Sequence, residues 1–318
     1  VLQSLNGSIN AVWVGRFLGE EALAATANGN ILMFILISFV FGFGMASTIL
    51  IGQAMGQGDK VMVKRTLGTA LGSIIPISVL LAVAGWLLGP MLLELLGTPN
   101  SAFNLALTYL RMIFIAMPVT LTFTLLMMAL RGTGDSTTPL WFIALSVAID
   151  LILTPLLILG VGPFPEWGIF GSAFATATAN TVALVGMITT LYLRGSVLVL
   201  NQSDLRFLRP DRDILKSMFS KGLPMGLQMI VISSAALTML SLINREGVHT
   251  TAAYSATQQL WTYVQMPAMA LSAAASAMVA QNIGANQWNR VAGITRWGLI
   301  FNVVLTGLLI VLMTIFDE

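Results

Sequence analysis

The sequence contains no cysteine, a single histidine and few charged residues. Without cysteine there are no disulfides or thiolate metal sites, and His249 alone cannot form a histidine-rich metal centre. Only 9% of the 318 residues are charged and 57% are hydrophobic, whereas a soluble domain carries roughly 25% charged residues. So few charges cannot cover the core of a soluble protein of this size. This excludes a soluble enzyme, a nucleic-acid-binding protein and a disordered chain, and it favours a protein that lies in the lipid bilayer.

Apolar runs long enough to cross a membrane recur along the whole chain. A span needs about 20 apolar residues, and no segment alternates like a barrel strand, so we predict an all-α, polytopic transmembrane helical bundle. No P-loop, HExxH motif or Ser/His/Asp set is present, so we expect neither an enzyme nor a bound cofactor. Nine helices are predicted, at residues 1–15, 26–52, 66–89, 102–129, 139–160, 169–193, 220–243, 252–280 and 292–316.

Positive charge is concentrated in alternate loops. Basic residues mark cytoplasmic loops, and twelve of the fifteen Lys and Arg residues follow the second, fourth, sixth and eighth predicted helices. We therefore predict that these four loops are cytoplasmic. The twelve residues are Lys60, Lys64, Arg65, Arg131, Arg194, Arg206, Arg209, Arg212, Lys216, Lys221, Arg290 and Arg296.

Two short motifs recur at the same offset of 228 residues. Gly19–Ala25 is similar to Gly247–Ala253, and Ile51–Gly56 is similar to Val279–Gly284. Because six predicted helices lie within this offset, both copies enter the membrane from the same side and form a parallel repeat. Transporters with such repeats rock two lobes about a central cavity.

The repeat also predicts how the chain is divided. Residues 1–194 form an N-terminal lobe of six helices, and 220–318 supply three helices of a second lobe. The polar segment 195–219 is predicted to be a cytoplasmic linker between them. We expect the complete protein to have twelve helices, with a first helix that is cut short here and three helices beyond residue 318.

Asp150 lies near the middle of the predicted helix at 139–160. A carboxylate at that depth costs at least ~2.5–3.5 kcal/mol and is a functional candidate by default. Ser146 and Thr154 lie one turn to either side on the same face, and Pro155 frees a carbonyl and bends the helix. This set predicts a site for a proton or a sodium ion. The alternative is an acid that only hydrogen-bonds a neighbouring helix.

Several segments resemble signatures of the multidrug and toxic compound extrusion (MATE) family. Residues 10–25 are similar to its first-loop signature, 131–139 to the loop between its fourth and fifth helices, and 150–158 to its fifth helix. The resemblance implies an antiporter that expels organic, cationic or amphipathic compounds in exchange for protons or sodium ions. It also implies a multi-pass protein of the bacterial inner membrane, which we expect to be a monomer.

The resemblance also points to Asn10. In many family members an acidic residue on the first helix joins the acid of the fifth helix, and Asn10 occupies the matching position. An amide cannot take up a proton at physiological pH, although it offers a carbonyl oxygen to a cation. We predict that Asn180 on the sixth helix completes the site. Thr176 and Thr178 are interpreted as interhelical contacts.

A second polar group lies on the seventh and eighth predicted helices. Amides beside aromatic rings suit amphipathic cations, partly through cation–π contact, so we predict a substrate-binding group there. Packing is the alternative for its aromatic members. Two other functions stay open, a lipid-linked oligosaccharide flippase and a non-transporting membrane scaffold. The predicted substrate-binding residues are Gln228, Gln258, Gln259, Trp261 and Tyr263.

Overall fold

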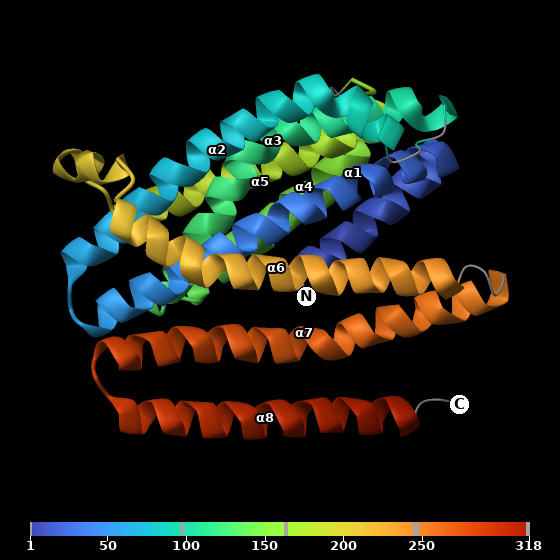
Figure 1. Cartoon of the computed structure of the whole chain (residues 1–318). Helices are drawn as coiled ribbons and strands as arrows, with labels where there is room; N and C mark the ends of the chain where they lie inside the picture. The colour runs from blue at the N-terminus through green and yellow to red at the C-terminus, as the bar shows by residue number, and fades with distance from the viewer. Residues whose placement is uncertain (1, 96–97, 99, 162–164, 244–247, 316–318) are drawn as a thin grey trace.

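Helices make up nearly all of the described chain in the computed structural model (Figure 1). The backbone is described for residues 2–95, 98, 100–161, 165–243 and 248–315. Within these ranges the description omits the side chains at 3–5, 20–21, 23–24, 27–37, 39, 100–101, 237, 240–241, 248–253, 255–256, 259–260, 262–263 and 312–313. The helices are α1 (Leu2–Gly56), α2 (Lys60–Leu95), α3 (Asn100–Thr133), α4 (Thr137–Leu159), α5 (Gly168–Leu193), the 3-10 helix η1 (Gln202–Leu208), α6 (Arg212–Ile243), α7 (Val248–Gly284) and α8 (Trp288–Ile315).

Helix α1 consists of two legs that meet at Gly19. This residue has φ 84° and ψ −175°, a conformation that glycine adopts without steric cost. The two legs run back along each other in Figure 1. The predicted helices at 1–15 and 26–52 lie on these legs, with no separate loop between them.

Five helices of the described chain are long and apolar enough to cross a membrane. They match the predictions at 66–89, 102–129, 139–160, 169–193 and 292–316. Several helices extend beyond the predicted apolar runs, because their polar terminal turns continue the same backbone hydrogen bonding outside the apolar stretch. Helix α2, for example, begins at Lys60.

The segment predicted as a linker, 195–219, contains η1 and the first two turns of α6, and it is attached to α2. The Lys64 ammonium lies 2.6 Å from Asp204 and holds the pKa of that carboxyl below its usual range. The backbone N–H of Ile214 and the Arg65 guanidinium likewise lower the pKa of Asp211. These contacts hold the segment against the start of α2.

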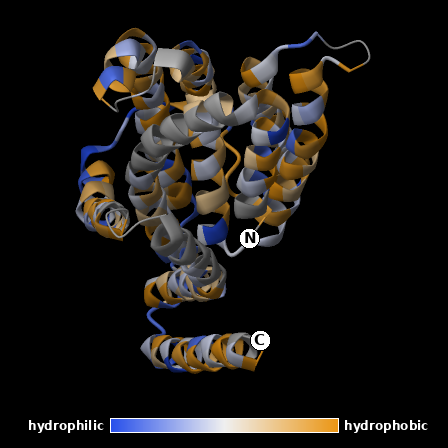
Figure 2. Cartoon of the chain, turned by 90° about the vertical axis from the view of Figure 1, so that its right-hand side faces the viewer, coloured by the Kyte–Doolittle hydropathy of each residue, from blue (hydrophilic) through white to orange (hydrophobic). Residues whose placement is uncertain are grey.

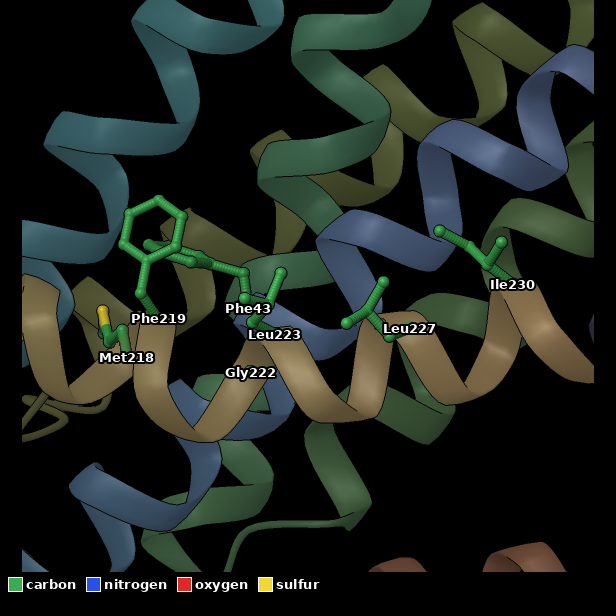
Figure 3. A pocket seen from close by; sticks show the side chains of 8 residues that line it. Phe43, Met218, Phe219, Gly222, Leu223, Leu227 and Ile230 are labelled. Atoms are coloured by element: carbon green, nitrogen blue, oxygen red, sulfur yellow. The ribbon is translucent and has the colours of Figure 1, made fainter.

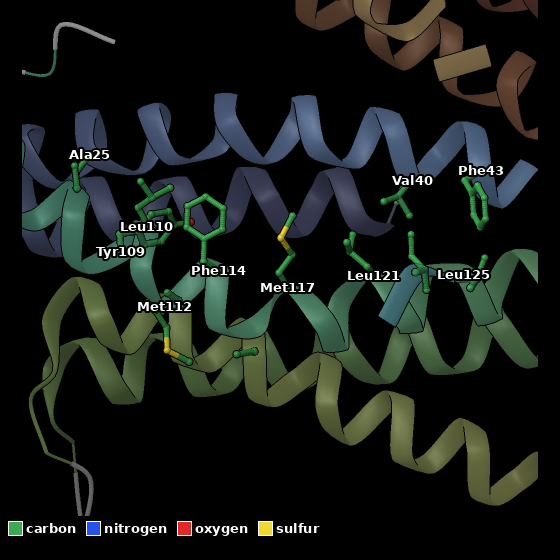
Figure 4. Close-up of a cluster of buried hydrophobic side chains, with 14 of the residues drawn as sticks. Ala25, Val40, Phe43, Tyr109, Leu110, Met112, Phe114, Met117, Leu121 and Leu125 are labelled. Carbon is green, nitrogen blue, oxygen red and sulfur yellow. The ribbon is translucent and has the colours of Figure 1, made fainter. Parts of the chain in front are cut away.

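Helix α3 is the central element of the bundle. Buried side chains follow it along its length and meet both legs of α1 (Figure 4). In contrast, α8 packs only on α7 within the described chain, so α7 and α8 project from the bundle as an outer layer (Figures 1 and 2). The buried residues of α3 that Figure 4 labels are Tyr109, Leu110, Met112, Phe114, Met117, Leu121 and Leu125.

The two copies of the shorter repeated motif pack against each other where α1 and α7 end. A Cβ atom added to Gly56 would overlap the carbonyl oxygen of Gln281, and one added to Gly284 would overlap that of Gln53. Each glycine therefore meets the glutamine of the other copy, as expected for a two-fold relation between them. Gln281 also donates from Nε2 to the carbonyl oxygen of Gly132 at 2.9 Å.

Candidate functional site

Asp150 is buried in the middle of α4, with 1% of its surface exposed. Asn6 donates from Nδ2 to its Oδ2 at 2.6 Å. Two hydroxyls donate to its Oδ1, from Thr176 at 3.0 Å and from Thr154 at 3.1 Å. Helices α1, α4 and α5 each supply one of these donors. All three donors are neutral, so the carboxylate is hydrogen-bonded without a fixed counter-charge in contact.

A second row of polar contacts lies beside Asp150. Ser146, one turn earlier on α4, donates to Oδ1 of Asn180 at 2.9 Å. The Nδ2 of Asn180 donates to the Thr120 hydroxyl on α3 at 3.3 Å. On α5, Ser172 donates to Oδ1 of Asn10 at 2.9 Å. Together the two rows connect both α1 and α3 to the face of α4 that carries the acid.

Most of these side chains line a cavity of about 500 Å³ within the N-terminal lobe. In the part of the chain that the structure describes, no three histidine or carboxylate side chains form a metal-binding group. The oxygens around Asp150 are instead the type of ligand that suits a hard cation such as sodium. The cavity is lined by Asn6, Gly7, Asn10, Ala11, Val14, Thr26, Phe41, Tyr109, Thr120, Phe123, Thr124, Met127, Met128, Arg131, Ile143, Ser146, Val147, Asp150, Thr176 and Asn180.

The structure brings the residues predicted for this site close to one another. Asp150, Ser146, Asn180 and Asn10 all line the cavity, and Thr154 bonds the carboxylate directly. Their role in cation coupling stays a prediction.

Two partners of Asp150 differ from expectation. Asn6, and not Asn10, contacts the carboxylate from α1. Asn6 lies one turn before Asn10 on the same helix, and this spacing could have identified Asn6 as a candidate from the sequence. Thr176 was interpreted as an interhelical contact only, but it donates to Asp150 and lines the cavity.

Arg131 was predicted to lie in a loop on the cytoplasmic side; it lies in a helix instead, and the side of the membrane stays a prediction. Helix α3 continues to Thr133, so Arg131 lies in its last turn, where it lines the cavity. Tyr109, near the opposite end of the same helix, lines it too. The cavity therefore extends along most of α3.

The segment after Arg131 caps the start of α4. Asp135 accepts hydrogen bonds from the backbone N–H groups of Thr137 and Thr138 and from the Thr138 hydroxyl. Burial raises the pKa of Asp135, but the bonds from Thr138 and Thr137 and the charge of Arg194 outweigh it, so the pKa lies below its usual range. Arg194 also donates to the Thr138 hydroxyl at 3.4 Å, which ties the end of α5 to this corner.

The predicted substrate-binding group lies away from this cavity. Gln228 is exposed on α6 and Trp261 is 60% exposed on α7. Gln258 is half-buried and donates to the Tyr254 hydroxyl at 2.7 Å. The side chains of Gln259 and Tyr263 lie outside the described residues. Substrate contact by this group stays a prediction.

The bend predicted at Pro155 also stays a prediction, because α4 continues through this residue as one helix from Thr137 to Leu159.

A smaller cavity of about 40 Å³ lies between α1 and α6 (Figure 3). It is too small for an organic ligand and presents no polar side chain. It is a packing defect of the helix contact and not a second candidate site. Its lining residues are Phe43, Met218, Phe219, Gly222, Leu223, Gly226, Leu227 and Ile230.

Comparison with known proteins matches the chain to the MatE family over residues 1–156 and 224–318. The chain is 37% identical over its whole length to the probable multidrug resistance protein YoeA of Bacillus subtilis (strain 168), of which it covers 69%. It is 31% identical over 89% of its length to the probable multidrug resistance protein YpnP of the same strain, of which it covers 62%. Over 95% of its length it is 28% identical to an FAD transporter of Shewanella oneidensis, of which it covers 66%.

The fold agrees with solved MATE structures. The structure described as MATE in the straight conformation matches 99% of this chain with a TM-score of 0.90, at 20% sequence identity and over 69% of its own length. The structure of MATE in the bent conformation matches the same shares of both chains with a TM-score of 0.89, at 21% identity. At this identity the likeness shows the fold alone.

Proposed function

The chain belongs to the MatE family of membrane-embedded multidrug transporters, and on this premise we propose that it is part of a secondary antiporter coupled through Asp150. The antiporter exports organic compounds, cationic or amphipathic, in exchange for protons or sodium ions. One relative is named an FAD transporter, so the proposal is not limited to cations. Because the chain spans 62 to 69% of the length of these relatives, the proposal concerns the whole protein that contains it.

The observation that carries the proposal is the environment of Asp150. A carboxylate at mid-span is costly, yet this one is buried beside a polar cavity and not turned toward lipid. No cation of the described chain pairs with it. The three hydrogen-bond donors are neutral, and they stabilise the ionised carboxylate. A proton or a sodium ion can displace one of them from the carboxylate.

Cation uptake at Asp150 changes what α1 can contact. A protonated carboxyl group becomes a donor, and a bound sodium ion draws the surrounding oxygens inward, so neither state preserves the Asn6 contact unchanged. The first leg of α1 then repacks against α4 and α5, the cavity contracts, and the exported compound leaves on the outer side. The cation drives this change only to the extent that it binds the two conformations with different affinity.

The test uses the complete native chain, purified and reconstituted in vesicles, with pH and sodium gradients imposed separately. Asp150→Asn keeps the size of the side chain but removes its charge, so we expect gradient-driven efflux of a cationic dye to fall to the level of empty vesicles. Insertion and thermal stability should be retained. The control is Asp213→Asn, an exposed acid at the start of α6. Efflux that persists in Asp150→Asn under either gradient would refute the role.

The location of the protein belongs to the same proposal. Family membership supports a monomer in the bacterial inner membrane. The bias of basic residues favours an orientation with the loops at 57–59, 134–136, 194–211 and 285–287 on the cytoplasmic side. A lipid-linked oligosaccharide flippase would need a strongly cationic cavity to bind a pyrophosphate group. Arg131 is the one basic residue among the described cavity residues, which counts against this alternative.

A further inference from the structure

Arg131 is the second charged residue of the Asp150 cavity, and it has no acidic partner. It is partly buried, and no hydrogen bond or ion pair joins its guanidinium to any described residue. The carbonyl ends of α3 carry partial negative charge, which favours a cation in the last turn. These carbonyl groups do not neutralise the charge of the guanidinium. A desolvated guanidinium without an anion is unfavourable, and a bound anion relieves this cost.

The two charges lie toward opposite ends of the cavity. Asn180 links Ser146 of α4 to Thr120 of α3, so these residues mark one level in the bundle. Arg131 lies about 16 Å beyond Thr120 along α3, at a rise of 1.5 Å per residue. Because α4 follows α3 after a short turn and runs in the opposite direction, Asp150 lies on the other side of that level, one turn past Ser146.

The stretch between Thr120 and Arg131 is mainly apolar. Phe123, Met127 and Met128 line the cavity there and are buried. Methionine side chains adapt to ligands of different shape, and an aromatic ring offers a face for stacking. This part of the cavity therefore suits the apolar body of an organic compound, next to a positive end.

We infer that Arg131 binds an anionic group of the exported compound, such as a carboxylate, sulfonate or phosphate. The guanidinium donates paired hydrogen bonds to the oxygens of such a group, and the apolar body lies along Phe123 and Met127. This inference rests on the proposed function and adds to its substrate class the amphipathic compounds that carry a negative group. The coupling cation and the exported compound then occupy opposite ends of one cavity, and they are linked through its shape and not by competition for one carboxylate.

The test compares two probes with the same xanthene core, the anion 6-carboxyfluorescein and the cation rhodamine 123. Equilibrium binding to the purified complete chain is measured by fluorescence anisotropy, without any gradient. We expect Arg131→Gln to weaken carboxyfluorescein binding about tenfold or more, the loss typical of a charge-assisted pair, and to leave rhodamine 123 unaffected. Arg131→Lys should restore part of the binding, because it returns the charge without the paired donors.

The control for charge alone is Arg212→Gln, an exposed residue at the start of α6, which should change neither probe. An equal loss of both probes in Arg131→Gln would overturn the inference and indicate a packing role. Unchanged binding together with increased proton leak would also overturn it and indicate an electrostatic barrier. If anion binding depends on Arg131 but no gradient drives efflux of either probe, the coupling proposal fails and this inference stands.

Discussion

The crossing of α1 and α7 offers the sharpest test of how the two lobes are joined. Gly56 and Gly284 occupy equivalent positions in the two repeated motifs, and each lies against a backbone carbonyl of the other helix. We predict that Gly56→Ala and Gly284→Ala each destabilise the complete protein. A carbonyl oxygen within a helix cannot rotate away from the new methyl group as a flexible side chain could, so the helices must separate.

The size of the effect follows from two opposing contributions. Adding a methyl group where there is no room costs about 1–3 kcal/mol. Replacing glycine by alanine within a helix stabilises it by about 0.8–1.0 kcal/mol. Because the overlap is with a backbone oxygen that cannot move aside, the packing cost should be about 2–3 kcal/mol, and we expect a net loss of about 1–2 kcal/mol for each variant. Because both methyl groups act on one crossing, the double variant should lose less than the sum of the two single losses.

Thermal unfolding of the purified complete chain in detergent measures this loss as a lower Tm. The matched control is Gly298→Ala on α8, which also faces α7 but whose added Cβ would lie 3.8 Å from the Ala275 Cβ atom, an ordinary contact. This control should leave Tm unchanged or raise it. If Gly56→Ala proves as neutral as Gly298→Ala, the helices do not cross as closely as described. A fully additive double variant would contradict the shared crossing.

Two further predictions concern the membrane surface. Asp135→Ala should lower stability by about 1 kcal/mol, as for the loss of a helix cap. Because the pKa of Asp135 is depressed in the folded protein, this difference should be full above the ordinary carboxyl pKa of about 4 and disappear as pH falls through the folded pKa. A Tm series of the variant and the native chain from pH 7 to 3 measures it, and a difference that does not depend on pH would contradict the cap. The sequence has no cysteine, so single cysteines can be labelled with a maleimide that does not cross the membrane. Gln57→Cys should react only from the cytoplasmic side and Glu166→Cys only from the outside. The reverse pattern would show that the predicted orientation is inverted.

The helical bundle could be predicted because lipid leaves few alternatives. A run of about 20 apolar residues has no water to satisfy its backbone groups, so it must form a helix. An apolar run locates the middle of each helix and not its ends. The prediction therefore missed the polar turns that extend α2 to Lys60 and α6 to Arg212. It also could not show that Gly19 joins two legs with no intervening loop.

The sequence pointed to Asp150 as the centre of the candidate site, but the predicted set of hydrogen-bond partners was incomplete. The depth of Asp150 in its span was sufficient to identify it, and helical spacing placed Ser146 and Thr154 on the same face. Spacing along one helix does not tell which residues of another helix face it. For this reason Asn6 was missed and Thr176 was interpreted as an interhelical contact without Asp150 as its partner, since both contacts depend on how α1 and α5 rotate against α4.

The error at Arg131 has a different cause, and it bears on how the two ends of the cavity act. Arg131 was assigned to the loop after the fourth predicted helix because of its charge, and charge alone cannot detect a basic residue that belongs to the last turn of a helix and faces inward. With Arg131 placed in the cavity, the N-terminal lobe has a negative and a positive end separated by apolar side chains. Under the two proposals, substitutions at Asp150 abolish the coupling of efflux to a gradient without changing which compound binds, and substitutions at Arg131 change which compound binds without abolishing the coupling. A variant at one end that altered both properties would show that cation and cargo share a single binding site.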